Sequence, residues 1–388
     1  LRSCSRRPRR VASAREKAVA AERILITGGA GFIGCHLTKA LLDRGHTVRV
    51  LDSLIDQVHG GREPNPILQH VELVEGDIRD PAAVASALQG VDAVVHLAAE
   101  VGVGQSMYAV ERYVGANDLG TAVLLEALLA KPVRRLVVAS SMSIYGEGLY
   151  RDQDGATIED AVRGDRKQTG TWDPVDAQGR PLVPVPTTEA KRPSLASVYA
   201  ITKFVQERMV LTVAPAYGME AAALRLFNVY GPGQALSNPY TGVLAIFAAM
   251  LLNGNGPQVF EDGAQRRDFV HVEDVARAFV LALERPEAVG QVFNIGSGQA
   301  VTIRQVAEEL ATAMGRRDIR PVLLGKARTG DIRHCFADIG AAQATLGFAP
   351  ERNFGNSLAE LAEWVRGQQT VDRVAEARRE LEVRGLVA

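Results

Sequence analysis

One stretch near the start of the chain constrains the fold more than any other. Residues 23–34 read RILITGGAGFIG, in which four apolar or β-branched residues lead into Gly28, Gly31 and Gly34, and an amphipathic run over 35–44 follows. This pattern predicts a buried strand, a tight turn and the start of a helix. Glycines let the backbone turn sharply and approach a pyrophosphate, and a helix N-terminus offers unpaired N–H groups to phosphates. We therefore expect a dinucleotide-binding unit, with a structural glycine turn in another α/β protein as the alternative.

The strand that follows indicates which dinucleotide the chain would bind. Residues 47–51 (TVRVL) predict a second strand that ends in Asp52, 18 residues after Gly34. A carboxylate at this place can accept hydrogen bonds from both hydroxyls of an adenosine ribose. Because the same carboxylate would repel a 2′-phosphate, the sequence favours NAD over NADP.

The bulk composition excludes several classes of protein. With 47% hydrophobic and 23% charged residues, the 388-residue chain is typical of globular proteins, and its net charge of −1 favours neither nucleic acid nor anionic membrane as a partner. The longest apolar run, 243–252, is too short to span a bilayer. Cys4, Cys35 and Cys335 are odd in number and widely spaced, so they predict no disulfide framework, no zinc site and a reducing cytoplasm. We expect a cytoplasmic protein without a bound metal.

Apolar segments along the chain alternate between strand and helix patterns. The expected strands after residue 52 are 71–75, 92–97, 135–139 and 221–227, and the expected helices are 81–88, 108–129, 195–216 and, at the charged end, 358–384. The alternation predicts an α/β fold with a Rossmann-type, doubly wound parallel sheet. Ligands bind outside the carboxyl ends of such strands, so Ser140–Gly146 is expected in the binding crevice.

The domain boundaries follow from changes in this pattern. Residues 1–22 carry six Arg, one Lys and two Glu, and we expect a basic disordered tail without an assigned function. Residues 23–228 are expected to form the NAD-binding Rossmann domain, interrupted over 147–192 by a polar, irregular surface insertion near the mouth of the site. Residues 229–388 predict mainly a smaller, mixed α/β substrate-binding lobe, with 267–285 returning to the Rossmann domain.

A second informative pattern is Tyr199-Ala-Ile-Thr-Lys203, on the helix expected over 195–216. The spacing of four residues places the phenol and the ammonium on one helix face. A phenol is a poor base at neutral pH, but a nearby ammonium and the positive nicotinamide ring lower the pKa of the phenol. A Tyr and a Lys on an ordinary surface helix are the alternative, against which stand the glycine turn and Ser141 at the sheet edge.

Together these segments resemble the extended short-chain dehydrogenase/reductases, specifically the NAD-dependent nucleotide-sugar epimerase/dehydratase family and its UDP-glucose 4-epimerase-like members. The resemblance covers about residues 23–348. The matching motifs are Thr27–Gly34 (TGGAGFIG), Gly76–Ile78 (GDI), His96–Ala99 (HLAA), Tyr199–Lys203 (YxxxK), Leu226–Pro232 (LFNVYGP), Arg267–Val272 (RDFVHV) and Arg328–Arg333 (RTGDIR). The resemblance also implies a homodimer, in which the Tyr199 helix and the helix around 123–129 pair across a two-fold axis; both helices buried within a monomer are the alternative.

The resemblance implies a role for each residue at a matching position. The implied catalytic residues are Ser141, which hydrogen-bonds the reacting hydroxyl, Tyr199 as acid and base, and Lys203. The implied cofactor-binding residues are Gly28, Gly31, Phe32, Ile33 and Gly34 at the pyrophosphate, Asp52 at the ribose, Asp77 and Ile78 at the adenine, and Leu97, Ala98, Ala99, Asn117, Tyr199, Lys203 and Phe227. The implied substrate-binding residues are Ser141, Asn228 and Arg267 (diphosphate), Val259, Arg328 and Asp331 (nucleoside), and Cys335. For Arg267, a solvated charge or a partner of Asp268 is the alternative.

The residues after Ser141 narrow the reaction. Dehydratases of this group have an acidic pair directly after the catalytic hydroxyl residue, whereas Met142 and Ser143 stand here and cannot serve as acid and base. The resemblance therefore implies 4-epimerisation of a UDP- or dTDP-hexose, by transient oxidation at C4 to a 4-keto sugar and non-stereospecific reduction. The alternatives are a ketoreductase, decarboxylase or dehydratase on the same scaffold, and a non-catalytic NAD-sensing module. The intact set of Ser141, Tyr199 and Lys203 speaks against the sensor.

Two further segments are similar to those of dTDP-L-rhamnose 4-epimerase-type enzymes, namely the insertion 147–192 and residues 57–60 (QVHG). Relatives can carry paired cysteines in that insertion. This chain has none there, so the soft ligands of a zinc site are absent. Cys335 stands where related 4-epimerases have a gating residue beside C2 of the sugar, and its small side chain predicts space for a 2-acetamido group. A buried core thiol is the alternative.

Overall fold

The computed structural model describes residues 21–387, except 61–63, 165, 167–169, 237, 239, 241, 328–330 and 369–373, and except the side chains of 374–378. The basic tail predicted for residues 1–22 therefore lies almost wholly outside the described residues.

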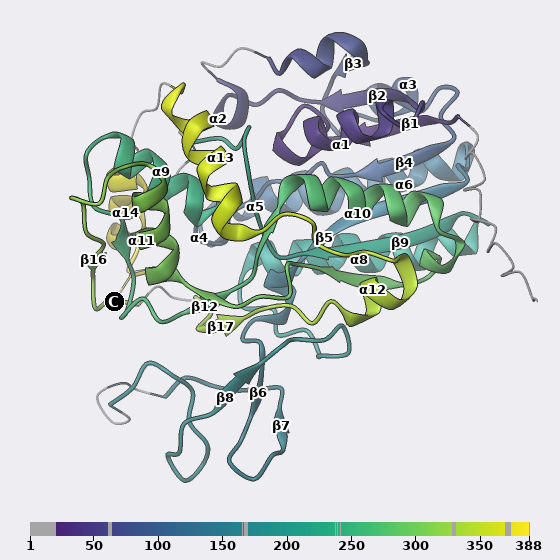
Figure 1. Cartoon of the computed structure of the whole chain (residues 1–388). Helices are drawn as coiled ribbons and strands as arrows, with labels where there is room; N and C mark the ends of the chain where they lie inside the picture. The colour runs from purple at the N-terminus through teal and green to yellow at the C-terminus, as the bar shows by residue number, and fades with distance from the viewer. Residues whose placement is uncertain are drawn as a thin grey trace, which may run out of the picture.

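A seven-stranded parallel sheet forms the centre of the molecule (Figure 1). Across the sheet the strands are β3 (Glu72–Glu75), β2 (Thr47–Asp52), β1 (Arg23–Thr27), β4 (Ala93–His96), β5 (Arg135–Ser141), β9 (Glu220–Leu226) and β14 (Val292–Ile295). Every pairing within it is parallel. The order reverses between β1 and β4, so a crevice opens at their carboxyl ends. The predicted doubly wound α/β fold is confirmed.

Helices cover both faces of the sheet, which is why β1, β4 and β5 are apolar on both sides. One face packs against α1 (Phe32–Leu42), α10 (Val272–Glu284) and α12 (Gly340–Leu346), and the other against α3 (Pro81–Ala87), α6 (Gly120–Ala130) and α8 (Val198–Ala216). Short helical segments lie in the connections, namely α2 (Asp56–His59), η1 (Pro66–His70), α4 (Val103–Ser106), η3 (Met142–Tyr145) and η4 (Pro286–Ala288).

The single helix predicted over 108–129 is interrupted. It consists of α5 (Val110–Tyr113), a π-helical turn η2 (Val114–Leu119) and α6. The wider turn places Asn117 in the interior, where its Oδ1 accepts a hydrogen bond from the N–H of Glu100 at 2.7 Å. Such turns inside helices occur at functional sites, and this one reaches the segment that follows β4.

The smaller lobe has its own apolar core, between α9 (Val243–Leu252), α11 (Ile303–Ala313) and α13 (Phe354–Arg366). Its short strands are β10 (Asn228–Tyr230) with β13 (Phe269–His271), β11 (Gln258–Val259) with β16 (Val322–Leu323), and β12 (Arg266–Arg267) between β15 (Val301–Thr302) and β17 (His334–Cys335). The helix predicted over 358–384 is two helices, because α13 ends at Gly367, a poor helix former, and α14 (Val374–Val383) is separate.

The insertion was predicted to be irregular, and most of its described residues lie outside helices and strands, but it also has a small sheet. It contains a three-stranded antiparallel sheet of β7 (Thr157–Ile158), β6 (Leu149–Arg151) and β8 (Val183–Val185), which projects from the body of the molecule (Figure 1). Strands of two or three residues are too short to show a period of two in the sequence.

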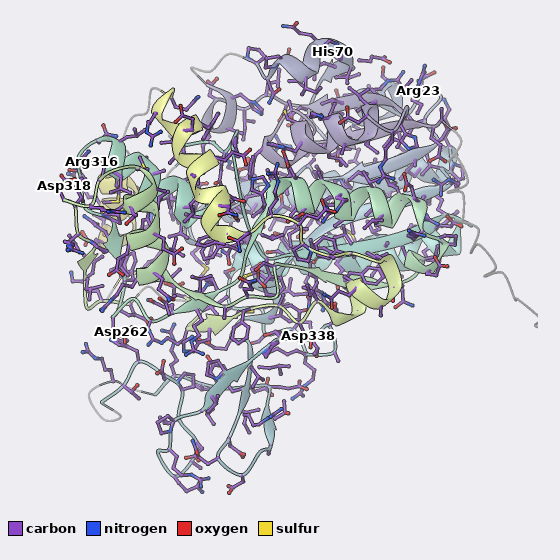
Figure 2. All side chains as sticks on the ribbon, viewed as in Figure 1. Arg23, His70, Asp262, Arg316, Asp318 and Asp338 are labelled. Atoms are coloured by element: carbon purple, nitrogen blue, oxygen red, sulfur yellow. The ribbon has the colours of Figure 1, made fainter. Side chains whose placement is uncertain are left out.

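A buried arginine attaches this projection to the smaller lobe. The guanidinium of Arg333 is 1% exposed and lies 2.6 Å from Asp173 of the insertion and 2.7 Å from both Glu261 and Asp262. Asp262 lies on the side of the body that faces the projection (Figure 2). Because Asp173 belongs to the insertion and Arg333 directly precedes β17, these ion pairs hold the insertion beside β17.

None of the helices in the described part of the chain is both long and apolar enough to cross a membrane. The described His, Cys, Asp and Glu side chains form no group of three or more that could hold a metal ion.

Candidate active site

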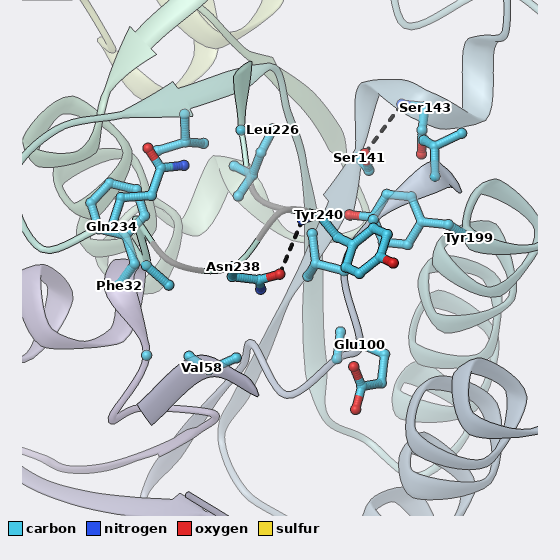
Figure 3. A pocket seen from close by; sticks show the side chains of 18 of the residues that line it. Phe32, Val58, Glu100, Ser141, Ser143, Tyr199, Leu226, Gln234, Asn238 and Tyr240 are labelled. Atoms are coloured by element: carbon cyan, nitrogen blue, oxygen red, sulfur yellow. Dashed lines mark hydrogen bonds between the residues drawn. The ribbon is translucent and has the colours of Figure 1, made fainter. Parts of the chain in front are cut away.

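A cavity of about 690 Å³ lies at the carboxyl ends of the strands and extends to the smaller lobe (Figure 3). Most of the residues predicted from the sequence line it. These are Gly28, Gly31, Phe32, Ile33, Gly34, Asp52, Asp77, Ile78, Leu97, Ala98, Ala99, Ser141, Tyr199, Lys203, Phe227, Asn228, Arg267 and Asp331. The fold thus brings residues from 28 to 331 to one cavity.

The glycine turn brings β1 and β4 close together beneath the cavity. Gly28 has a φ of +68°, and a Cβ at this position would lie 2.8 Å from the backbone of Ala98. Only glycine meets both requirements. α1 begins directly after the turn and has no side-chain cap at Gly31, so its first N–H groups face the cavity. This arrangement fits the pyrophosphate of a dinucleotide.

Asp52 is held at the cavity wall by backbone groups. Its Oδ2 accepts a hydrogen bond from the N–H of Ala30 at 3.0 Å, and its Oδ1 accepts one from the N–H of Leu54 at 2.9 Å. Leu54 has a φ of +47°, which a leucine rarely adopts. These two hydrogen bonds fix the Asp52 carboxylate where the adenosine ribose is expected. A carboxylate there can accept hydrogen bonds from the ribose hydroxyls, so the site fits NAD.

A buried ion pair fixes α8 against the sheet. Glu207 on α8 and Arg225 on β9 approach to 2.7 Å, with side chains 0% and 7% exposed. The hydroxyl of Ser140, at the end of β5, donates to the second oxygen of Glu207 at 2.6 Å. Because this pair joins α8, β5 and β9, it sets Tyr199 opposite Ser141.

The environment of Tyr199 differs from our expectation. We predicted that Lys203 lowers the pKa of the phenol, but burial raises the pKa of Tyr199, and the opposing contribution comes from a hydrogen bond with Ser141. The Oγ of Ser141 also accepts a hydrogen bond from the N–H of Ser143 at 3.2 Å (Figure 3). The side chains of Tyr199 and Ser141 both line the cavity, so the phenol and the Ser141 hydroxyl are placed to act on one substrate atom.

Lys203 is buried one turn beyond Tyr199 on α8. Its side chain reaches Gln206, whose Oε1 accepts a hydrogen bond from Nζ at 2.6 Å. Burial lowers the pKa of Lys203 to about 7, although the carboxylates of Glu207 and Asp118 act in the opposite direction. The lysine therefore titrates near neutral pH, unlike an exposed one.

The substrate side of the cavity presents Asn228, Arg267 and Asp331. The guanidinium of Arg267 donates to the carbonyl oxygens of Ile332 and of Arg333, and lies 3.8 Å from Asp331. Asp268 instead accepts hydrogen bonds from backbone N–H groups, including those of Ser297 and Gly298. Arg267 is thus oriented by the irregular segment directly before β17 and is not the partner of Asp268.

Three predicted residues that the structure describes are not in the cavity wall. Val259 is fully buried in the core of the smaller lobe, while its neighbours Gln258 and Phe260 line the cavity, because successive residues of a strand point to opposite faces. Asn117 is buried behind the wall and binds the backbone of Glu100. Cys335 is the third, and the predicted residue Arg328 lies outside the described residues.

The position of Cys335 does not agree with the hypothesis that this residue gates the sugar pocket. Its side chain is 0% exposed and belongs to a buried cluster with Tyr145 and Phe227, and the cavity lining does not include it. Phe227, which lines the cavity, belongs to the same cluster. The structure therefore favours the buried core thiol that the sequence left as the alternative.

Sequence reasoning missed the residues at the mouth of the cavity. Glu100, Met107, Tyr240, Leu381 and Leu386 line it, and the last two belong to α14 and the residues after it. These positions are far apart in sequence and follow no common motif.

Contacts at the mouth join α14 to two loops. The guanidinium of Arg384 lies 4.4 Å above the ring of Tyr108, whose hydroxyl is 2.6 Å from that of Tyr240. Tertiary packing alone brings the C-terminal helix to the site.

Known proteins are similar to this chain over most of its length. The model of the NAD dependent epimerase/dehydratase family matches residues 24–296. The chain is 36% identical to the dTDP-L-rhamnose 4-epimerase of Burkholderia thailandensis, over 91% of this chain and 96% of that protein. It is 30% identical to the dTDP-glucose 4,6-dehydratase of an Actinoplanes species, over 90% and 99% of the two chains.

A solved structure of the UDP-glucose 4-epimerase of Thermus thermophilus in complex with NAD is similar to this one. The TM-score is 0.71 at 31% identity, with 89% of this chain and 100% of that chain covered. The cofactor is NAD, which the glycine turn and Asp52 fit. The chain belongs to the NAD dependent epimerase/dehydratase family.

Proposed function

We propose that this protein is an NAD-dependent nucleoside-diphosphate-sugar 4-epimerase that acts on a UDP- or dTDP-hexose. The observation that carries the proposal is the set of Ser141, Tyr199 and Lys203 at one cavity, with Met142 and Ser143 in place of an acidic pair. The similarity to an enzyme named dTDP-L-rhamnose 4-epimerase supports it.

The proposed chemistry assigns one task to each residue. When bound, NAD would supply the acceptor for the hydride from C4 of the sugar and the donor that returns it. Tyr199 Oη accepts the proton of the sugar 4-hydroxyl as C4 is oxidised, and donates it back as C4 is reduced. Ser141 Oγ hydrogen-bonds the 4-oxygen and stabilises charge that develops there. Lys203 binds the cofactor. Reduction from the other sugar face requires that the 4-keto sugar turns within the cavity.

The same cavity argues against elimination of water. Dehydration needs an acid and a base beyond the residues that oxidise C4, and Met142 has no titratable group. Ser143 lines the cavity with a hydroxyl, which is a weak acid and a weak base. Epimerisation needs neither group, so it is the reaction this site supports best.

The test is incubation of the purified protein with a panel of UDP- and dTDP-hexoses without added cofactor, followed by NMR at C4. We expect inversion at C4 of at least one sugar, with NAD retained on the protein. Loss of the C6 hydroxyl signal would show a dehydratase. Accumulation of reduced cofactor in proportion to product, or release of CO₂, would show net redox or decarboxylating chemistry, and either result would contradict the proposal.

We also propose that the protein is a homodimer. Apolar side chains are exposed on α5, η2 and α8, namely Val110 (45%), Val114 (41%), Leu119 (54%) and Ile201 (43%). Such a patch favours association. The residues around 123–129 on which we based the prediction include Leu124, Leu125 and Leu128, which instead pack against the sheet.

Light scattering at micromolar concentration is expected to give twice the 41.6 kDa chain mass. The variant Leu119→Arg should shift the mass to that of one chain, because a buried unpaired charge opposes association. Val289→Arg, at an exposed valine elsewhere on the surface, is the matched control and should remain dimeric. A wild-type mass of one chain would refute the dimer.

A further inference from the structure

Gln206 lies between Lys203 and the sheet, and none of the motifs in the sequence includes it. It is 0% exposed and follows Lys203 by one helix turn on α8. We propose that Gln206 is a positioning residue, which holds the Lys203 ammonium toward the cofactor side of the cavity and ties it to the ends of β1 and β4. The catalytic part of this inference rests on the proposed function, whereas its effect on NAD binding does not.

The two ends of the Gln206 amide have different partners. Its Oε1 accepts from Lys203 Nζ at 2.6 Å. Its Nε2 donates to the hydroxyl of Thr121 at 2.9 Å and to the carbonyl of Ala98 at 3.3 Å, and lies 3.2 Å from His96 Nε2. A flipped amide would set N–H groups against the ammonium and an oxygen against the carbonyl of Ala98. The orientation is therefore determined by the donors and acceptors around it.

The partners of Gln206 belong to the cavity floor. The carbonyl that it contacts is that of Ala98, which lines the cavity beside Leu97 and Ala99. His96 Nδ1 is 2.7 Å from the hydroxyl of Thr27, the last residue of β1, and that hydroxyl accepts from the N–H of Ala98 at 3.3 Å. A displacement of the floor is therefore transmitted to Lys203 through one amide.

A neutral amide at position 206 affects the charge of the Lys203 ammonium differently from a carboxylate. The groups whose charges act on Lys203 are Glu207 on α8, which is paired with Arg225 on β9, and Asp118 on η2. His96 on β4 is uncharged near neutral pH, since burial lowers its pKa to about 3. Gln206 thus binds the ammonium without neutralising it, whereas a carboxylate at this place would add a negative charge two turns beyond Tyr199 on the helix.

Two substitutions at Gln206 distinguish the effect of losing the hydrogen-bond acceptor from the effect of adding a charge. Gln206→Met removes both the acceptor and the Nε2 donor and adds no charge, whereas Gln206→Glu keeps an oxygen for Lys203, replaces the donor with a second oxygen and adds a negative charge. We expect Gln206→Met to weaken NAD binding, measured by calorimetry on protein freed of cofactor, by about tenfold or more, and Gln206→Glu to stay within about threefold of wild type. The added carboxylate should raise the pKa of Tyr199 and of Lys203.

The pH profile of kcat is the second measurement. Activity requires the deprotonated Tyr199 as acceptor, so a raised pKa moves the acid limb to higher pH, by about one unit or more in Gln206→Glu and by less than about 0.3 unit in Gln206→Met. Asn294→Asp makes the same amide-to-acid change at a buried amide of β14 that does not contact Lys203, and should not move the profile. Melting temperatures report folding of each variant.

The outcomes distinguish the possibilities. Equal weakening of NAD binding in both Gln206 variants, or an acid limb that moves no more in Gln206→Glu than in Asn294→Asp, would overturn the positioning role and leave Gln206 as a packing residue. If Gln206→Met does not fold, the pH profile of Gln206→Glu tests the positioning role. If Gln206→Glu does not fold, the NAD affinity of Gln206→Met tests it. If the wild type epimerises no sugar of the panel, the proposed function fails, and the calorimetric comparison still tests Gln206.

Discussion

Tyr199→Phe is expected to lower kcat by about 10³-fold while NAD and sugar binding stay within a few-fold of wild type. The substitution removes one oxygen and keeps the ring, which packs edge-on against Tyr113 with centroids 6.4 Å apart. The phenol lines the cavity and is hydrogen-bonded with Ser141, so its removal takes away the group placed to accept the proton. Single-turnover measurement, by appearance of reduced cofactor after mixing with substrate, should show that oxidation at C4 is the step that is lost.

The matched control is Tyr113→Phe. It removes a neighbouring hydroxyl that donates to Gln105 at 3.3 Å and leaves the edge-on contact with Tyr199 intact. Its kcat should remain within about threefold of wild type. A Tyr199→Phe enzyme that keeps more than about a tenth of its activity would show that another group accepts the proton.

Gly34→Ala is expected to destabilise the fold by at least about 3 kcal/mol and to lower the melting temperature by about 5 °C or more. A Cβ at Gly34 would lie 2.4 Å from the carbonyl oxygen of Gly29 and 2.5 Å from its Cα. Both are backbone atoms of the turn, so no side chain can move aside to relieve the clash.

Gly31→Ala makes the same change three residues earlier in the turn. Its Cβ would approach only the carbonyl oxygen of Gly28, at 3.3 Å. We expect a melting temperature close to wild type but weaker NAD binding, since this backbone must approach the pyrophosphate. Thermal unfolding and NAD calorimetry on both variants test the pair, and similar melting temperatures for Gly34→Ala and wild type would contradict the steric argument.

Local patterns in the sequence predicted the elements that position the site. The strand–turn–helix around Gly28 and the Tyr199–Lys203 spacing depend on residues close in sequence, so period and residue type suffice to predict them. Prediction was poorer where elements are short or irregular. The strands of the insertion have two or three residues, and the π-helical turn around Asn117 has no separate signature in the sequence.

The sequence by itself determined the sheet, the glycine turn and the placing of Tyr199 and Lys203 on one helix, because each depends on contacts within a few residues or on strands long enough to show a pattern. Only the tertiary structure decided that Cys335 is a core thiol, that α14 reaches the cavity mouth, and that burial raises the pKa of Tyr199. Burial and electrostatic environment are sums over neighbours from distant parts of the chain. Gln206 shows this most clearly, because its role depends on residues of β4, of the segment after β4 and of α6 that surround one amide.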